Sequence, residues 1–287
     1  MNRLKLITIA GLSALALSAC SGDKNLAAKD PVTAAKNLSE ALRANDLDRF
    51  SHIMVPPEDY AKMEARFKDQ QGKQPAPSAD ESKQFEATLA QFTASDAEAK
   101  LFAEIQPKLA QMGPQIPMGV ALMTGMAGQS IDQSSKLTPA EKEQAKTVLT
   151  AVTKWATTAP LADEAKAKQA IGIVVGTARE LKLSTLDAAR KLSYPEVMVK
   201  AGVAVGGLRK VLGVYGFDTD KMLASVTVEK KSEDGDKAVV TVHYTILDAP
   251  VGFDMEMVRR DGRWYSADLL KSVESSLGAA ASPAVAN

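Results

Sequence analysis

The segment Lys-Ala-Val-Val-Thr-Val-His-Tyr-Thr-Ile-Leu at residues 237–247 alternates apolar and polar side chains from Val240 onward. Successive residues of a strand point to opposite faces of a sheet, so this pattern predicts a half-buried β-strand. The same alternation recurs in neighbouring segments of the C-terminal region, at residues 225–232, 251–260 and 263–267. The end of the chain therefore predicts four strands.

Short turn signals separate these four runs. Asp-Gly pairs stand at residues 234–235 and 261–262, and Asp-Ala-Pro at 248–250 is the expected middle turn. Such short connections predict a four-stranded antiparallel meander over residues 224–268. Strand parity then gathers large apolar side chains on one face. We expect a candidate apolar pocket on that face, lined by Tyr244, Phe253, Met255, Met257 and Trp264.

Before the sheet, apolar residues recur at helical spacing. Asp30-Pro31 predicts the start of the first helix, and Thr138-Pro139-Ala140-Glu141 is a capping box that predicts another. Residues 80–216 form a long helical insertion in this interpretation. The predicted fold class is α+β, with N-terminal and inserted helices packed on one face of the meander. We expect one domain over residues 31–272, and a disordered tail at 273–287.

Two segments carry a family resemblance. Ala-Leu-Arg-Ala-Asn-Asp-Leu-Asp-Arg-Phe at residues 41–50, together with Val-Arg-Arg-Asp-Gly-Arg-Trp-Tyr at 258–265, resembles the NTF2-like group. The resemblance implies a sheet curled around packed helices as a cone with an apolar pocket. Residues 80–216 have no counterpart in a minimal cone, so the resemblance covers the two ends of the mature chain.

The N-terminus has the layout of a secretory signal. Arg3 and Lys5 precede an uncharged apolar run at residues 6–17, which is too short to span a membrane. Residues 1–19 are therefore predicted to be a signal peptide.

The stretch Leu17-Ser18-Ala19-Cys20 resembles a bacterial lipobox. The resemblance implies cleavage before Cys20 and acylation of its sulfur. Ser21, where some lipoproteins carry aspartate, implies sorting to the outer membrane. Residues 20–30 then form a polar tether, and the membrane is a partner through the lipid anchor.

Composition excludes several classes of partner and chemistry. The chain has 35 Lys and Arg against 35 Asp and Glu, which argues against nucleic acid and against a polybasic membrane surface. Cys20 is the only cysteine, so no thiol nucleophile remains once it is acylated. We expect no cofactor.

Catalytic and metal motifs are missing from the sequence. The two histidines, His52 and His243, stand outside any ligand spacing, so no metal site is predicted. In some NTF2-like enzymes an aspartate and a histidine perform acid-base chemistry inside the pocket. Here parity points His243, Asp254 and Glu256 away from the apolar face. We therefore assign no catalytic residue.

Two apolar segments have two interpretations each. Residues 112–126 are rich in Met and Gly, which fits an adaptable binding surface, although a gap-filling core element is favoured. Residues 197–215 predict a buried central helix in which Gly202 and Gly206 permit close approach of another helix; helix dimerisation in a membrane is the alternative.

The leading functional hypothesis is a non-enzymatic lipoprotein on the periplasmic face of the outer membrane, acting as a binding module for an unknown envelope protein. A carrier of a small apolar ligand or lipid is the second hypothesis, with its pocket between the sheet's apolar face and the helical insertion. An NTF2-like isomerase or hydrolase is the third.

Overall fold

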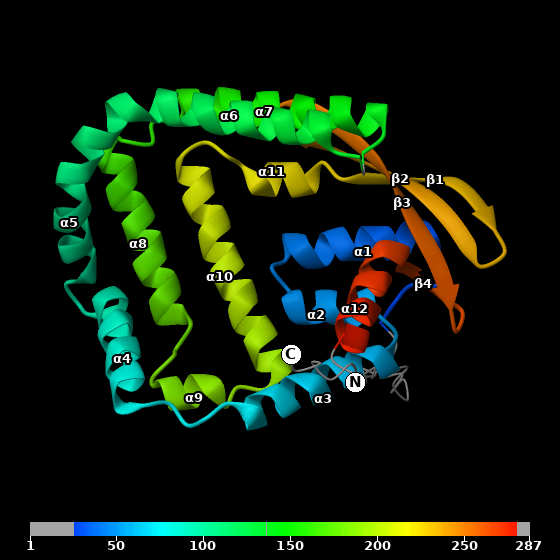
Figure 1. The fold of residues 1–287 in the computed structure, drawn as a ribbon, viewed down its shortest axis with the longest axis horizontal. Coiled ribbons are helices and arrows are strands. Elements are labelled where there is room, and N and C mark those ends of the chain that lie inside the picture. The colour runs from blue at the N-terminus through cyan, green and yellow to red at the C-terminus, as the bar shows by residue number, and fades with distance from the viewer. Residues whose placement is uncertain (1–25, 136, 280–287) are drawn as a thin grey trace, which may run out of the picture.

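The computed structural model describes residues 26–135 and 137–279. It is an α+β structure in which most helices precede one four-stranded antiparallel sheet, as the sequence predicts (Figure 1). The first helices are α1 (Pro31–Arg43), α2 (Leu47–Met54), α3 (Pro57–Lys73), α4 (Ala79–Thr93) and α5 (Ala97–Met112). A 3-10 turn, η1 (Gly113–Gln115), then leads into α6 (Ile116–Gln133), α7 (Pro139–Thr158), α8 (Glu164–Glu180), α9 (Leu186–Arg190), α10 (Tyr194–Val214) and α11 (Thr219–Ala224).

The sheet has the strand order β1-β2-β3-β4. Its strands are β1 (Thr227–Asp234), β2 (Lys237–Ile246), β3 (Ala249–Arg260) and β4 (Arg263–Ser266). The meander is confirmed, but the middle turn is Leu247-Asp248, with both φ angles positive, and Pro250 belongs to β3. Proline is tolerated opposite Thr245 because the Thr245 amide donates to the Ser225 hydroxyl on the other side of β2.

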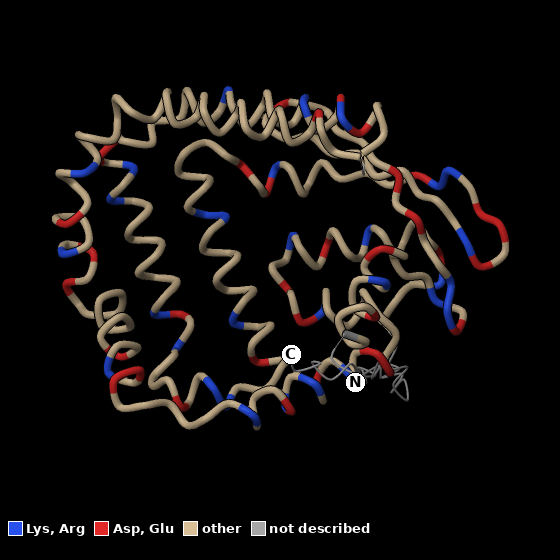
Figure 2. Tube along the Cα trace, viewed as in Figure 1, with Lys and Arg blue, Asp and Glu red and all other residues tan. Residues whose placement is uncertain are grey.

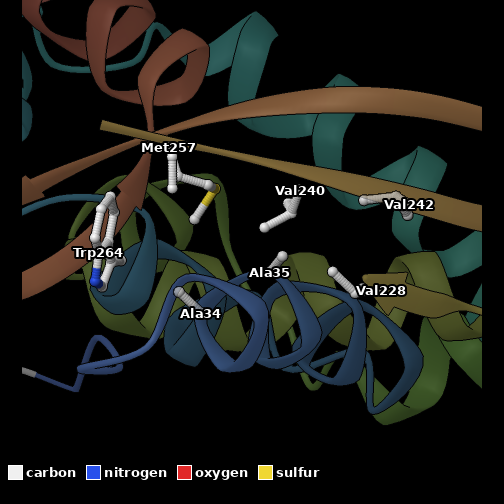
Figure 3. Close-up of a cluster of buried hydrophobic side chains, with 8 residues drawn as sticks. Ala34, Ala35, Val228, Val240, Val242, Met257 and Trp264 are labelled. Atoms are coloured by element: carbon white, nitrogen blue, oxygen red, sulfur yellow. The ribbon is translucent and has the colours of Figure 1, made fainter. Parts of the chain in front are cut away.

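Helix α1 covers the apolar face of the sheet. Its Ala34 and Ala35 are small enough to let the helix approach the strands closely, as Figure 3 shows. They pack against the buried side chains of Val228, Val240, Val242, Met257 and Trp264. This cluster is the core, and its apolar composition follows the parity of the strands.

The first turns of α7 lie against the other, polar face of the sheet. A cleft between them is lined by Thr241, His243 and Thr245, which alternate along β2 with the core residues Val240 and Val242. The expectation that all the helices pack on one face is therefore too simple. The N-terminal helix covers the apolar face, whereas the inserted α7 faces the polar one.

The end of the chain is more ordered than the sequence suggests. Residues Ala267–Ala279 form helix α12, in which Leu270 and Val273 are buried beside Tyr265. The predicted disordered tail from 273 onward is thus wrong up to 279, because the alanine- and serine-rich composition hides an apolar stripe. Residues 280–287 lie outside the described part of the chain.

Helix α10 passes close to two other elements through its glycines. A Cβ atom on Gly202 would lie 2.1 Å from the Asn45 carbonyl oxygen, and one on Gly207 would lie 2.3 Å from the Thr177 hydroxyl. Close approach at Gly202 and Gly206 is confirmed, but the neighbour there is Asn45 in the loop between α1 and α2, and the neighbouring helix, α8, approaches at Gly207 instead. The prediction of a helix buried all round is wrong, because Val199 and Leu208 are exposed.

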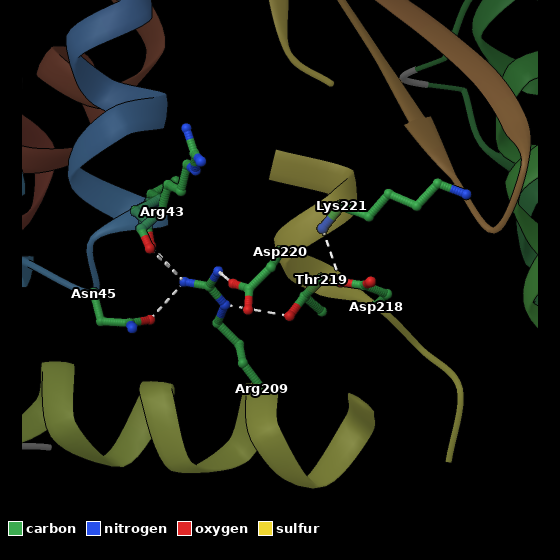
Figure 4. Close-up of polar contacts among 8 residues, drawn as sticks. Arg43, Asn45, Arg209, Asp218, Thr219, Asp220 and Lys221 are labelled. Atoms are coloured by element: carbon green, nitrogen blue, oxygen red, sulfur yellow. Dashed lines mark hydrogen bonds and ion pairs between the residues drawn. The ribbon is translucent and has the colours of Figure 1, made fainter. Parts of the chain in front are cut away.

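The Arg209 side chain links α10 by hydrogen bonds to the end of α1 and to α11 (Figure 4). Its guanidinium donates to the carbonyl oxygens of Leu42 and Arg43, which end α1, and to the Asn45 side chain 2.6 Å away. It also donates to Thr219 and pairs with Asp220. A charged donor at the carbonyl end of a helix adds hydrogen bonds that favour the helix dipole, so this contact is structural.

Candidate functional site

The predicted lipidation site cannot be placed. Cys20 and the signal peptide lie outside the described residues. Within the described residues, no helix combines the length and apolar character needed to cross a membrane.

The five residues of the predicted apolar pocket are distributed between two environments. Met257 and Trp264 are 2% and 1% exposed in the core, and Met255 packs against them. Tyr244 and Phe253 are on the same face of the sheet as Val242 but outside this cluster, and their rings meet edge to face at 6.4 Å, with Phe253 40% exposed. The space beside Trp264 is filled by α1, so the structure does not bring the five together around one cavity.

Helix α6 displays a row of large apolar side chains to solvent. Met118, Leu122, Met123 and Met126 are each more than half exposed, with Met118 at 78%. Met118, Leu122 and Met126 follow one another at intervals of four residues, which aligns them along one side of the helix. Met112, at the end of α5, is exposed as well. We call these five residues the α6 face.

The opposite side of α6 explains why these side chains point outward. Thr124 and the α7 residue Thr153 are hydrogen-bonded at 2.8 Å, and Gly128 lies beside Leu149 of α7. Small side chains at this seam let the two helices pack along their length at the edge of the molecule (Figure 1). Because the small residues of α6 face α7, its methionines lie on the opposite, outer side of the helix.

Charge is also missing from this region of the sequence. Between Lys108 and Asp132 no residue is charged. The corresponding trace in Figure 2 is therefore tan. An exposed helix usually carries charges on its solvent side, so the α6 face is unusual on both counts.

The cleft beside α7 has a volume of about 730 Å³. One wall comes from Thr138, Glu141 and Gln144 on the first turns of α7, and the other from the polar face of β1, β2 and β3. The Thr138 amide donates to Glu141 and so lowers the pKa of its carboxyl. Lys231 and Thr241 both donate to Asp254, which lowers the pKa of that carboxyl as well. Both acids are therefore ionised at neutral pH.

His243 and His52 occupy unrelated places. His243 lines the cleft and lies over Gly252, its partner on β3, where a Cβ atom would be 2.6 Å from Nδ1. His52 stacks on Tyr60 with ring centroids 3.7 Å apart. Burial, followed by the charge of Asp48, raises the pKa of Tyr60, so this phenol stays protonated as a packing element. The described residues contain no cluster of three or more ligands suited to a metal.

Sequence reasoning missed the wall of the cleft on α7. Glu141 and Gln144 belong to a helix that the sequence does predict, but no local signal tells which face of the sheet that helix covers. The exposure of the α6 face did have a signal, which is the uncharged run from 109 to 131 beside a capped, charged helix.

Comparison of the chain with protein-family models, with curated protein sequences and with solved structures gave no match. The likeness to the NTF2-like group stays a prediction from the sequence.

Proposed function

We propose that this protein is a lipoprotein on the periplasmic face of the outer membrane, and that it acts as a non-enzymatic binding module for another envelope protein. The observation that carries the proposal is the α6 face. The lipobox-like segment ending at Cys20 supports the location.

The chemistry of the α6 face favours a protein partner over a lipid surface. Helices that lie in a membrane interface carry Lys or Arg beside their apolar side, whereas α6 has neither. Methionine is unbranched and polarizable, so a surface rich in it adapts to apolar partners of different shape. Full burial of one such side chain contributes about 1.5–3 kcal/mol, which makes four adjacent ones an adequate anchor for a partner.

Crosslinking followed by reconstitution tests the partner. A photoreactive amino acid at Leu122 in living cells should crosslink to one envelope protein, which mass spectrometry identifies. With that protein purified, the double variant Met118→Glu/Leu122→Glu should weaken binding at least tenfold, since two charges would have to be buried without partners. Leu208→Glu on α10 is the matched control, because Leu208 is 59% exposed outside the α6 face, and it should bind normally.

Three outcomes contradict this proposal. Crosslinks exclusively to lipid would make the α6 face a membrane contact, and crosslinks exclusively to a second copy would make it a dimer interface. Equal loss of binding in the double variant and in Leu208→Glu would show that the partner binds elsewhere.

The anchor has its own test. Cys20→Ala should move the protein from the membrane fraction to the soluble fraction, because the acyl chains account for its retention. Retention of the variant in membranes would remove the lipid anchor from the proposal while leaving the α6 face untouched.

A further inference from the structure

The cleft between α7 and the polar face of the sheet has the volume of a small-molecule site. It measures about 730 Å³, within the range of ligand pockets, roughly 300–1,000 Å³. Its walls come from segments far apart in the chain, with the first turns of α7 on one side and β1, β2 and β3 on the other. The α6 face lies on a different helix, which packs against α7, so the two surfaces are separate.

Strand register decides which side chains face this cleft. Thr241, His243 and Asp254 share one parity and face α7. Tyr244 and Phe253 have the opposite parity, so their rings point to the other face of the sheet. Quaternary ammonium groups and aromatic cations bind over the faces of such rings. The side chains that face the cleft instead suit a ligand that forms hydrogen bonds and ion pairs.

One carboxylate of the cleft keeps its charge uncompensated. Glu141 accepts from the Thr138 amide at 2.7 Å and from its hydroxyl at 2.8 Å, and both donors are neutral. Asp254 is instead paired with Lys231 at 2.6 Å, and it also accepts from Thr241. No Lys or Arg is among the residues that line the cleft in the described structure. The N-terminus of α7 carries about half a positive charge, which offsets Glu141 only in part, so the cleft is negative.

Two more carboxylates flank the cleft on the same face of the sheet. Glu229 is on β1 and Glu256 is on β3, each two residues beyond a side chain that lines the cleft. Both are exposed, and neither has a hydrogen-bond or ion-pair partner within the described part of the chain. The negative surface ends beyond Glu256, where Lys237 and Lys271 line the neighbouring groove beside α12.

These carboxylates are spread out, which suits a ligand with separated positive charges. Side chains two positions apart on a strand are about 7 Å apart. Within the described residues, no three ligands converge as a metal ion would need. Gln144 and Thr227 line the cleft between the carboxylates, and in the described structure their side chains have no hydrogen-bond partner. Their oxygens can therefore accept hydrogen bonds from ammonium groups.

We propose that this cleft, together with Glu229 and Glu256 at its rim, binds a linear aliphatic polyamine. Such a ligand is a chain of methylene groups with ammonium groups at intervals. Its charges pair with the separated carboxylates, and its remaining N–H groups are hydrogen-bonded by the neutral side chains of the cleft.

Isothermal titration calorimetry on the purified full chain tests the proposal, with spermidine as the probe. The titration is made in about 0.15 M NaCl, which screens attraction between distant exposed charges. We expect saturable binding of spermidine that persists in the presence of an equimolar amount of Mg²⁺.

Two charge-matched variants locate the site. Glu141→Gln removes the uncompensated charge of the cleft but keeps an acceptor for the helix cap, and it should weaken spermidine binding about 3- to 10-fold. Glu81→Gln removes one negative charge from the equivalent capping box of α4, outside the cleft lining. This control has the same net charge and should bind like the unaltered chain.

Lys231→Gln should have the opposite effect. The lysine competes with the ligand for Asp254, so its removal frees a second carboxylate of the cleft. Spermidine binding should tighten about 2- to 5-fold, the effect of one exposed ion pair. Residues with a role only in folding would not produce this gain.

Absence of saturable spermidine binding overturns the proposal. Displacement of spermidine by equimolar Mg²⁺ also overturns it, because the surface would then attract cations in general. Equal affinities of Glu141→Gln and Glu81→Gln, or weaker binding by Lys231→Gln, overturn the assignment to this cleft. None of these outcomes bears on the α6 face, whose test detects a protein partner.

Discussion

The sheet core and the α6–α7 hairpin use large apolar side chains in opposite ways. In the core, Met257 and Trp264 are almost inaccessible beneath α1 (Figure 3). In the hairpin, Met118 and Leu122 are 78% and 65% exposed. Helices α4, α6 and α7 contain no fully buried side chain, and α5 contains only Ala97. Apolar surface thus stabilises the fold in the first region and stays exposed to solvent in the second.

The largest expected effect distinguishes these two regions directly. Trp264→Ala should lower the free energy of unfolding by about 3–5 kcal/mol, because it opens a cavity in a packed cluster. Leu122→Ala should change it by less than about 0.5 kcal/mol, since an exposed side chain loses few contacts. Urea denaturation followed by circular dichroism measures both. Comparable losses would mean that the α6 face is part of the core.

A matched pair of glycine substitutions gives the next largest effect. Gly202→Ala should destabilise the protein by about 1–3 kcal/mol, because its Cβ would collide with the Asn45 backbone. Gly119→Ala in α6 should instead stabilise by about 0.5–1 kcal/mol, as alanine is the better helix former and nothing lies within 4 Å. Thermal unfolding measures whether each substitution raises or lowers the stability of the protein. A destabilising Gly119→Ala would indicate that the outer side of α6 is covered.

Acidification should give the smallest effect, which we follow at the helix starts. Glu81 and Glu141 accept the N-cap amides and hydroxyls of α4 and α7, and Glu196 accepts the Ser193 hydroxyl and amide at the start of α10; these hydrogen bonds lower the pKa of each carboxyl. A pKa lowered by folding contributes stability above the ordinary value of 4.5 that is lost as pH falls below it. The core cluster of α1 and the sheet contains no titratable side chain.

Hydrogen exchange compared at about pH 6 and about pH 3.5, corrected for intrinsic rates, should therefore show faster exchange at the first turns of α4 and α7 and little change at the core residues Val240 and Val242. Glu141→Gln keeps an acceptor that does not titrate, so its α7 should lose this pH dependence. Uniform acceleration across the sheet and helices would show one cooperative unit instead.

Prediction from the sequence succeeded where the signal was local. The alternation at 237–247, the Asp261-Gly262 turn and the Thr138–Glu141 capping box all appear in the structure, because each depends on residues a few positions apart; the first hairpin turn falls one residue later than Asp234-Gly235, at Gly235-Asp236. Errors arose where the answer depended on distant residues. Leu247-Asp248 replaced 248–250 as the middle turn, and α12 formed where a tail was expected, since its apolar stripe packs on Tyr265.

The sequence by itself determined the α+β class, the strand parity and the absence of charge along residues 109–131. Only the tertiary structure decided that α1 takes the apolar face of the sheet, that α7 faces the polar side to form the cleft, and that the methionines of α6 point outward. The physical reason is that the spacing of apolar residues in the sequence identifies which side of a helix or strand is apolar. Which surface covers that side depends on side-chain volumes far along the chain, such as Ala34, Ala35 and Gly128, which decide how closely two elements can approach.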